Sequence, residues 1–163
     1  MARALYHGYT SQFTLAAAST TLPAFFIANT DAQHAMQLEK VRIGMAGTGA
    51  ASCTFQLITS NAAATAAGTS SAGTITQDSG RIMANGGISV CGFNYTAART
   101  TETYIVVDVL TIVNNQTYVY DYQGSGDNPD CPLGVATFGA GFGVFISAGT
   151  PVATTIDMWV SRI

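Results

Sequence analysis

The sequence predicts an all-β sandwich or barrel, and three observations lead to that prediction. Short segments of alternating apolar and polar residues dominate the chain, and glycine, asparagine, aspartate and proline stand between them. These segments are rich in β-branched and aromatic residues. Helical periodicity is scarce, since the one candidate helix, residues 29–40, fits an extended or mixed conformation slightly better. Short strands in close succession indicate two packed sheets.

The chain divides into two predicted parts. Residues 1–30 are aromatic, strand-like and interrupted by Pro23, so we expect an extended N-terminal arm and lead-in. Residues 31–163 form the expected single sandwich domain. Within it, the low-complexity stretch near residues 60–77 lacks a large apolar stripe, and we expect a long surface loop there. Predicted strands cover residues 41–46, 52–60, 87–96, 101–113, 116–123, 134–139, 143–148 and 154–163.

The last predicted strand carries large apolar groups on both of its faces. One face combines Ile156, Met158 and Val160, and the other carries Trp159 and Ile163. Such a strand suits a position inside a sheet, with its own core on one face and a neighbour on the other.

The clearest local signal is a tight turn at Asn114–Asn115, because asparagine tolerates the positive φ angles that a two-residue turn requires. If the flanking strands form a hairpin, β-branched residues oppose a stripe of tyrosines and Asp108 faces Asp121. Two carboxylates about 5 Å apart repel by roughly 3 kcal/mol at an effective dielectric near 20. The hairpin therefore needs solvent or an arginine to screen the pair, a bulge that shifts the register, or a cation. The candidate arginines are Arg42, Arg81 and Arg99.

The composition indicates an assembly. Charged residues make up 9% of the chain, against roughly 25% in an average soluble domain. A free monomer with so few charges is poorly protected against association, so we expect a homo-oligomer. The net charge of −3 argues against a nucleic-acid partner. The longest apolar run, residues 22–28, is too short to cross a bilayer, and the first residues do not form a signal peptide, so we expect a cytoplasmically made protein without a membrane partner.

Residues for catalysis or cofactor binding are few. His7 and His34 are the only histidines, and neither lies in a recognisable catalytic motif. The glycine-rich segments do not match a phosphate-binding loop. We therefore expect no enzymatic activity and no cofactor. The three widely spaced cysteines fit reduced, packed thiols better than a disulfide framework or a metal site.

One acidic stretch offers a candidate cation loop. Asp121, Asp127 and Asp130 lie close together in a segment rich in glycine and proline, and the predicted hairpin adds Asp108. Calcium takes several oxygen ligands from flexible loops. The spacing matches no recognised ligand pattern and also suits ordinary turns, so we expect no bound metal.

An aromatic arm precedes an all-β core that is poor in lysine and rich in alanine, glycine and threonine, and the last strand, TIDMWVSRI, runs to the final residue. This combined pattern resembles the small jelly-roll virion proteins of tailed bacteriophages, particularly capsid decoration (cement) proteins. The resemblance implies an antiparallel jelly-roll-like sandwich without catalytic residues. It also implies a homotrimer, located in the virion, that bridges subunits of the major capsid protein.

The candidate interface residues follow from this resemblance and from the aromatic content of the chain. They are Tyr6, Tyr9, Phe13, Phe25, Phe26 and Trp159. Two alternatives remain open. A host-recognition or carbohydrate-binding jelly roll of a phage tail or fibre would need an exposed aromatic and amide site. A jelly-roll enzyme would need His7 or His34 close to a carboxylate or metal.

Overall fold

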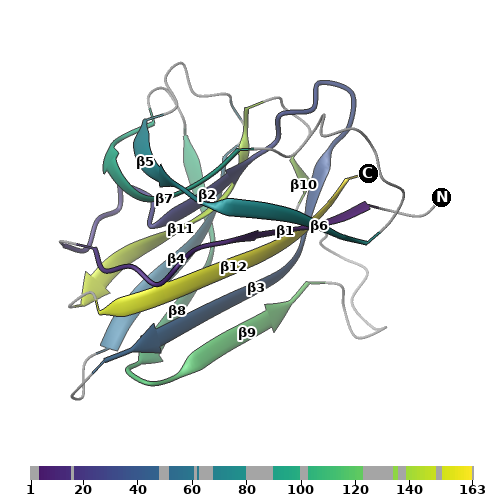
Figure 1. The fold of residues 1–163 in the computed structure, drawn as a ribbon. Coiled ribbons are helices and arrows are strands. Elements are labelled where there is room, and N and C mark those ends of the chain that lie inside the picture. The colour runs from purple at the N-terminus through teal and green to yellow at the C-terminus, as the bar shows by residue number, and fades with distance from the viewer. Residues whose placement is uncertain are drawn as a thin grey trace.

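The chain forms two antiparallel β-sheets packed face to face, as a computed structural model shows (Figure 1). The structure describes residues 4–15, 17–47, 52–60, 62, 68–79, 90–99, 103–122, 134–135, 139–149 and 152–162. Within these ranges there is no helix, and the all-β sandwich predicted from the sequence is confirmed. No helix in the described ranges has the length and apolar character to cross a membrane.

Each sheet has six strands. Sheet A, the nearer one in Figure 1, contains β1 (Ala4–Tyr9), β3 (Met36–Ala46), β6 (Thr74–Ser79), β9 (Thr117–Asp121), β10 (Gly134–Val135) and β12 (Ala153–Arg162). Sheet B contains β2 (Phe25–Ala28), β4 (Ser52–Ser60), β5 (Thr69–Ala72), β7 (Val90–Ala97), β8 (Tyr104–Val113) and β11 (Gly141–Gly149). The order is β10-β3-β12-β1-β6 in sheet A, where β9 also pairs with β3, and β5-β7-β2-β11-β4-β8 in sheet B.

Eight of these strands have the order of a jelly roll. In chain sequence they are β1, β2, β3, β4, β8, β9, β11 and β12. In sheet A the neighbours are β1, β12, β3 and β9, which are the first, eighth, third and sixth of these strands. In sheet B the neighbours are β2, β11, β4 and β8, which are the second, seventh, fourth and fifth. This alternation between sheets is the double Greek key of a jelly roll. The inserted strands β5, β6 and β7 extend both sheets on the side opposite β8 and β9.

The first strand occupies a different place from the predicted arm. β1 lies between β12 and β6 in the interior of sheet A, and Leu5 to Tyr9 face Ser161 to Asp157 of β12. Phe13 and Ser19 continue the attachment through bridges to Thr154 and Ile146. Residues 4–28 are therefore part of the sandwich and do not precede it. The prediction was wrong because the partners of these aromatic residues lie far along the chain, as in the pairing of Tyr6 with Val160 and the contact of Phe13 with Phe93.

The low-complexity stretch also differs from the prediction, which placed a surface loop near residues 60–77. Thr69–Ala72 and Thr74–Ser79 form β5 and β6, which pair with β7 and β1 respectively. Gly73 between them donates its amide to the Cys91 carbonyl at 2.9 Å, so the chain stays attached while it passes from sheet B to sheet A. The prediction missed these strands because it required an apolar stripe. Threonine and serine can form an exposed edge strand without providing one.

The turn at Asn114–Asn115 is present, but the predicted hairpin is not. Gln116 donates its amide to the Val113 carbonyl at 3.2 Å, and Asn115 has a φ of 62°. After the turn the strands diverge, because β8 pairs with β4 in sheet B whereas β9 pairs with β3 in sheet A. The expected pairing of Asp108 with Asp121 was therefore wrong. The two carboxylates do not face each other across a hairpin, since Asp108 lies opposite Leu57 and Asp121 lies opposite Lys40.

The core lies between the sheets and follows the period-2 alternation of their strands. Sheet A contributes Leu38, Val41, Ile43, Ile156, Met158 and Val160, and sheet B contributes Phe25, Ile27, Phe55, Phe142, Val144 and Ile146. All of these side chains are almost completely buried. The last strand is thus in the interior of a sheet, as predicted, with its even-numbered face on the core. Cys53 and Cys91 are buried and form no disulfide with each other, while Cys131 lies outside the described residues.

Candidate functional site

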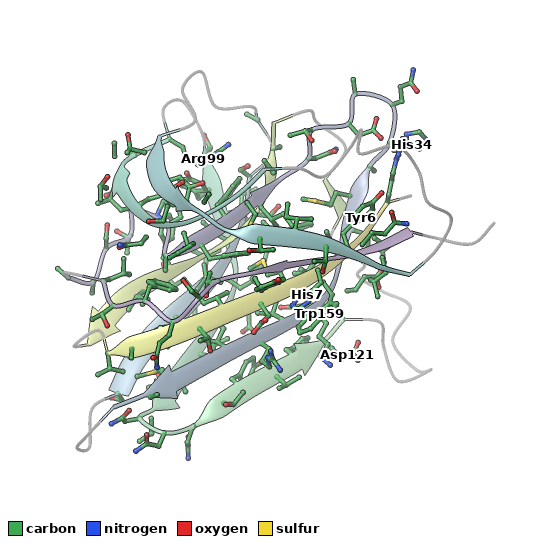
Figure 2. The ribbon with its side chains drawn as sticks, in the orientation of Figure 1. Tyr6, His7, His34, Arg99, Asp121 and Trp159 are labelled. Atoms are coloured by element: carbon green, nitrogen blue, oxygen red, sulfur yellow. The ribbon has the colours of Figure 1, made fainter. Side chains whose placement is uncertain are left out.

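The outer face of sheet A carries a cluster of interacting polar and aromatic side chains. Three adjacent strands build its centre, since the register places His7 of β1 opposite Trp159 of β12, and Trp159 opposite Lys40 of β3. Figure 2 shows His7 and Trp159 side by side on this face, with Asp121 nearby. Because side chains alternate along a strand, these residues face away from the core that their neighbours fill.

Trp159 is surrounded by cationic and aromatic groups. The imidazole of His7 stacks on the indole with ring centroids 4.2 Å apart and planes inclined by 7°. The Lys40 ammonium lies 5.1 Å from the Trp159 ring centroid, and the Arg42 guanidinium lies 5.6 Å from it. Cations at such distances are attracted by the negative face of the indole ring. These contacts fix the half-buried Trp159 side chain on the surface of the sheet.

Asp157 ties the same strands together through its carboxylate. Its Oδ1 lies 3.0 Å from His7 Nε2, and its Oδ2 accepts a 2.9 Å hydrogen bond from Arg42 Nε. The carboxylate is 9% exposed, whereas the Arg42 side chain is 48% exposed. The hydrogen bond to Asp157 raises the pKa of Arg42, so the guanidinium stays charged. The arrangement resembles the carboxylate–histidine pair of general-base catalysis, but arginine already occupies the second carboxylate oxygen.

A shallow hollow of about 200 Å³ opens beside Trp159. It is lined by Leu5, Glu39, Lys40, Asp121 and Trp159. A register shift between β12 and β3 leaves Glu39 as an extra residue in β3, and such bulges redirect side chains. The Glu39 side chain is buried and accepts a hydrogen bond from the Ser161 hydroxyl. Carboxylates, an ammonium group and an indole together suit a small polar ligand rich in hydroxyl groups.

The second histidine belongs to a separate cluster at the far end of β12. His34 Nδ1 lies 3.0 Å from Asp31 Oδ2, and Arg162 forms an ion pair with the same carboxylate oxygen. Burial opposes ionisation of Asp31, but a hydrogen bond from the Gln33 amide and the charges of Arg162 and His34 lower its pKa. This cluster fixes the loop between β2 and β3 to the end of the last strand, which is a structural task.

Most of the predicted interface residues lie in the interior. Tyr6, Phe13 and Phe25 belong to the main core, so the expectation that they contact another subunit was wrong. Phe26 is also buried, in a small second cluster on the outer face of sheet B, where the Arg99 guanidinium lies 4.2 Å from its ring centroid. The other two predicted residues, Tyr9 and Trp159, are half-buried on the outer face of sheet A.

The predicted cation loop does not assemble among the described residues. Asp108 and Asp121 lie in different sheets, and Asp127 and Asp130 fall outside the described ranges. No group of three or more potential ligands occurs in the part of the chain that the structure describes. Instead, Asp108 lies near the tyrosines of β9. Burial raises the pKa of Tyr118 and Tyr122, and the negative charge of Asp108 adds to that rise.

Sequence reasoning missed a concentration of exposed large apolar residues on the two strands at one side of the sandwich. β8 and β9 are the edge strands of their sheets on the same side of the molecule, seen at the lower side of Figure 1. Their exposed large apolar residues are Ile105, Val106, Val109, Val113, Val119 and Tyr120. The run Ile105–Val107 contains no polar residue and interrupts the alternation expected of a strand with one face in water. This interruption is the signal that could have revealed this concentration.

Comparison with protein-family models, with curated proteins and with solved structures gave no significant match to this chain.

Proposed function

We propose that this protein is a non-enzymatic structural protein of a virion, a capsid decoration (cement) protein that bridges and stabilises subunits of the major capsid protein. It is made in the host cytoplasm, assembles into a homotrimer and acts on the surface of the capsid. The observation that carries the proposal is a jelly roll whose exposed large apolar side chains, among the described residues, lie on the two edge strands β8 and β9.

Jelly rolls serve in viral capsid proteins and in lectins, so the fold alone leaves several functions open. An apolar surface of this kind marks a site of protein association. With 9% charged residues, the chain has few groups to keep such a surface soluble, and association removes that surface from water.

The proposal is tested with capsid shells of the virus that encodes the protein. Purified protein is mixed with expanded and with unexpanded shells, and bound protein is measured after sedimentation. We expect saturable binding to expanded shells and a higher temperature of shell disruption after binding. The absence of binding to both kinds of shell would overturn the proposed function.

A second candidate function, a host-recognition or carbohydrate-binding module of a phage tail or fibre, is favoured by the hollow beside Trp159. Its carboxylates, ammonium group and indole could together contact the hydroxyl groups and apolar face of a sugar. Glycan-array binding that disappears in Trp159→Ala and persists in Tyr120→Ala, a change at an exposed tyrosine on β9, would favour this candidate over the capsid function.

A further inference from the structure

We propose that Asp108 of β8 and three tyrosines of β9 form a binding site for a guanidinium group. The tyrosines are Tyr118, Tyr120 and Tyr122. A small guanidinium compound and the arginine side chain of a partner protein present the same chemistry to such a site. This site goes beyond the proposed function and does not depend on it.

Asp108 is a half-buried carboxylate on the inner side of sheet B. It lies opposite Leu57, which is buried in the core, and paired residues of antiparallel strands have their side chains on the same side of the sheet. Its Oδ1 accepts a 2.8 Å hydrogen bond from the Val109 amide. The ion pairs among the described residues do not include Asp108. A partly desolvated carboxylate without a counterion favours a cationic ligand.

The strands beside Asp108 offer no cation on this side of the sandwich. β8, β9 and β4 contain no lysine, arginine or histidine. β3, the neighbour of β9, carries Lys40 and Arg42, but both lie on the outer face of sheet A, where they contact Trp159. Within the described part of the chain, these strands therefore leave the place of the counterion to a ligand.

The tyrosines of β9 face Asp108 from the inner side of sheet A. Tyr120 lies opposite Val41 of the core, and Tyr118 and Tyr122 share its direction because alternate residues of a strand point to the same side. The ring centroids of Tyr118 and Tyr120 are 6.3 Å apart, and those of Tyr120 and Tyr122 are 4.4 Å apart, so the rings form a row. Burial, followed by the negative charge of Asp108, raises the pKa of Tyr118 and Tyr122. The carboxylate thus acts on both ends of the row.

A guanidinium group fits this combination better than a metal ion does. One carboxylate provides too few oxygen ligands for calcium or magnesium. Guanidinium is planar and weakly hydrated, stacks on aromatic rings and donates two parallel hydrogen bonds to a carboxylate. Asp108 supplies the carboxylate, and Tyr120, which is 43% exposed, supplies an accessible ring whose face attracts cations.

The first test compares a charged ligand with its neutral isostere. Ethylguanidinium chloride and ethylurea are titrated separately into the full-length protein at constant ionic strength, and two-dimensional NMR spectra follow the backbone amides. We expect saturable shifts within residues 106–110 and 117–122 with ethylguanidinium and none there with ethylurea. The absence of saturable shifts in these segments, or equal shifts with both compounds, overturns the site.

The second test removes the charge of Asp108 and leaves its shape. Asp108→Asn keeps an oxygen that can accept the Val109 amide, whereas Thr111→Asn, a change at an exposed residue on the other side of β8, is the matched control. We expect Asp108→Asn to bind ethylguanidinium at least about tenfold more weakly than the wild type, and Thr111→Asn to bind it equally well. Unchanged binding by Asp108→Asn, or an equal loss in both variants, overturns the site.

The contribution of the aromatic row is tested at its exposed member. Tyr120→Phe keeps the ring and should bind ethylguanidinium about as well as the wild type, whereas Tyr120→Leu lacks the ring and should bind it several-fold more weakly. Unchanged binding by Tyr120→Leu would show that the tyrosines do not belong to the site.

Capsid shells then distinguish the two sources of the guanidinium group. If an arginine of the shell fills the site, Asp108→Asn binds expanded shells more weakly than Thr111→Asn does. Equal shell binding by these variants assigns the site to a small guanidinium compound. A wild-type protein that binds shells but not ethylguanidinium overturns the site and retains the capsid function, whereas binding of ethylguanidinium without binding of shells does the reverse.

Discussion

The imidazole of His7 lies parallel to the indole of Trp159 with 4.2 Å between ring centroids, although about 150 residues separate them in the chain. They meet because β1 pairs with β12. The same pairing brings His7 Nε2 within 3.0 Å of Asp157 Oδ1, and Arg42 reaches that carboxylate from β3. Three strands of sheet A are therefore joined on their outer face by side chains as well as by backbone hydrogen bonds.

Replacing Asp157 with Asn is expected to lower the free energy of unfolding by about 1–3 kcal/mol, because the amide cannot serve both the Arg42 and the His7 nitrogens as a charged acceptor. Urea unfolding at pH 7 measures the effect. Asp121→Asn is the control, since Asp121 is exposed on β9 and its substitution should cost less than about 1 kcal/mol. Equal losses in both variants would show that the Asp157 interactions contribute nothing specific.

Stability is expected to fall as the pH rises above about 8.5. Burial raises the pKa of the Cys91 thiol to about 12, whereas a thiol in an unfolded chain ionises near 8.5. The native state therefore keeps a proton that the unfolded state loses, and the free energy of unfolding decreases by about 2 kcal/mol between pH 8 and pH 10. Urea unfolding under reducing conditions measures this decrease. In Cys91→Ala the decrease should be smaller, and an unchanged pH dependence would contradict the assignment.

Gly141→Ala is expected to destabilise the sandwich by about 3 kcal/mol or more, because an added Cβ would lie 2.0 Å from the Ile27 carbonyl oxygen in the neighbouring β2 strand. The obstacle is backbone and cannot rotate away. Gly44→Ala is the matched control in β3, where the nearest atom is the Thr155 hydroxyl at 2.8 Å, on a side chain that can rotate. Thermal unfolding should show a much larger decrease in Tm for Gly141→Ala, and similar Tm values would refute the predicted clash.

The place of β1 inside sheet A predicts different effects for its two faces. Tyr6→Ala removes a buried aromatic side chain and should cost about 3–5 kcal/mol, whereas Tyr9→Ala removes a half-buried one on the outer face and should cost less. Deleting residues 1–9 should prevent folding, since β12 and β6 would each lose a neighbour. Circular dichroism and urea unfolding measure both effects. A folded deletion variant would show that β1 is dispensable.

The sequence predicted several strands that pack one face on the core, such as β4 and β12, but β1 and β2 were not among the predicted strands although they also contribute to the core. Val41, Ile43 and Met45 alternate with residues of the outer face, and β3 has that pattern in the structure. What a sequence of this kind cannot reveal is which strands become neighbours. The Asn114–Asn115 turn was located correctly, but its local geometry is compatible both with a hairpin and with a passage between sheets. The aromatic residues near the start looked unpartnered because their contacts are formed with β11, β12 and other distant strands.

The candidate site was less predictable for the same reason. Trp159 was identified as a candidate interface residue on one face of the last strand, but its neighbours His7, Lys40 and Arg42 come from two other strands. Their meeting depends on a register that is set along the whole of β1 and β3. Glu39 could not be placed at all, because its position depends on a bulge that leaves no mark in the pattern of apolar residues.

The pairing of β1 with β12 also determines the order in which sheet A can form during synthesis of the chain. A ribosome releases residues 4–9 early, yet their neighbour on one side, residues 153–162, emerges only after all the other strands have been made. Folding rates fall as contacts become more distant in sequence, so sheet A is expected to close slowly. During translation the edge of β1 that pairs with β12 remains exposed to chaperones and to other nascent chains, although β6 is already available for the other edge. The pairing that completes sheet A therefore joins one of the first described strands to be made with the last one, residues 4–9 with residues 153–162.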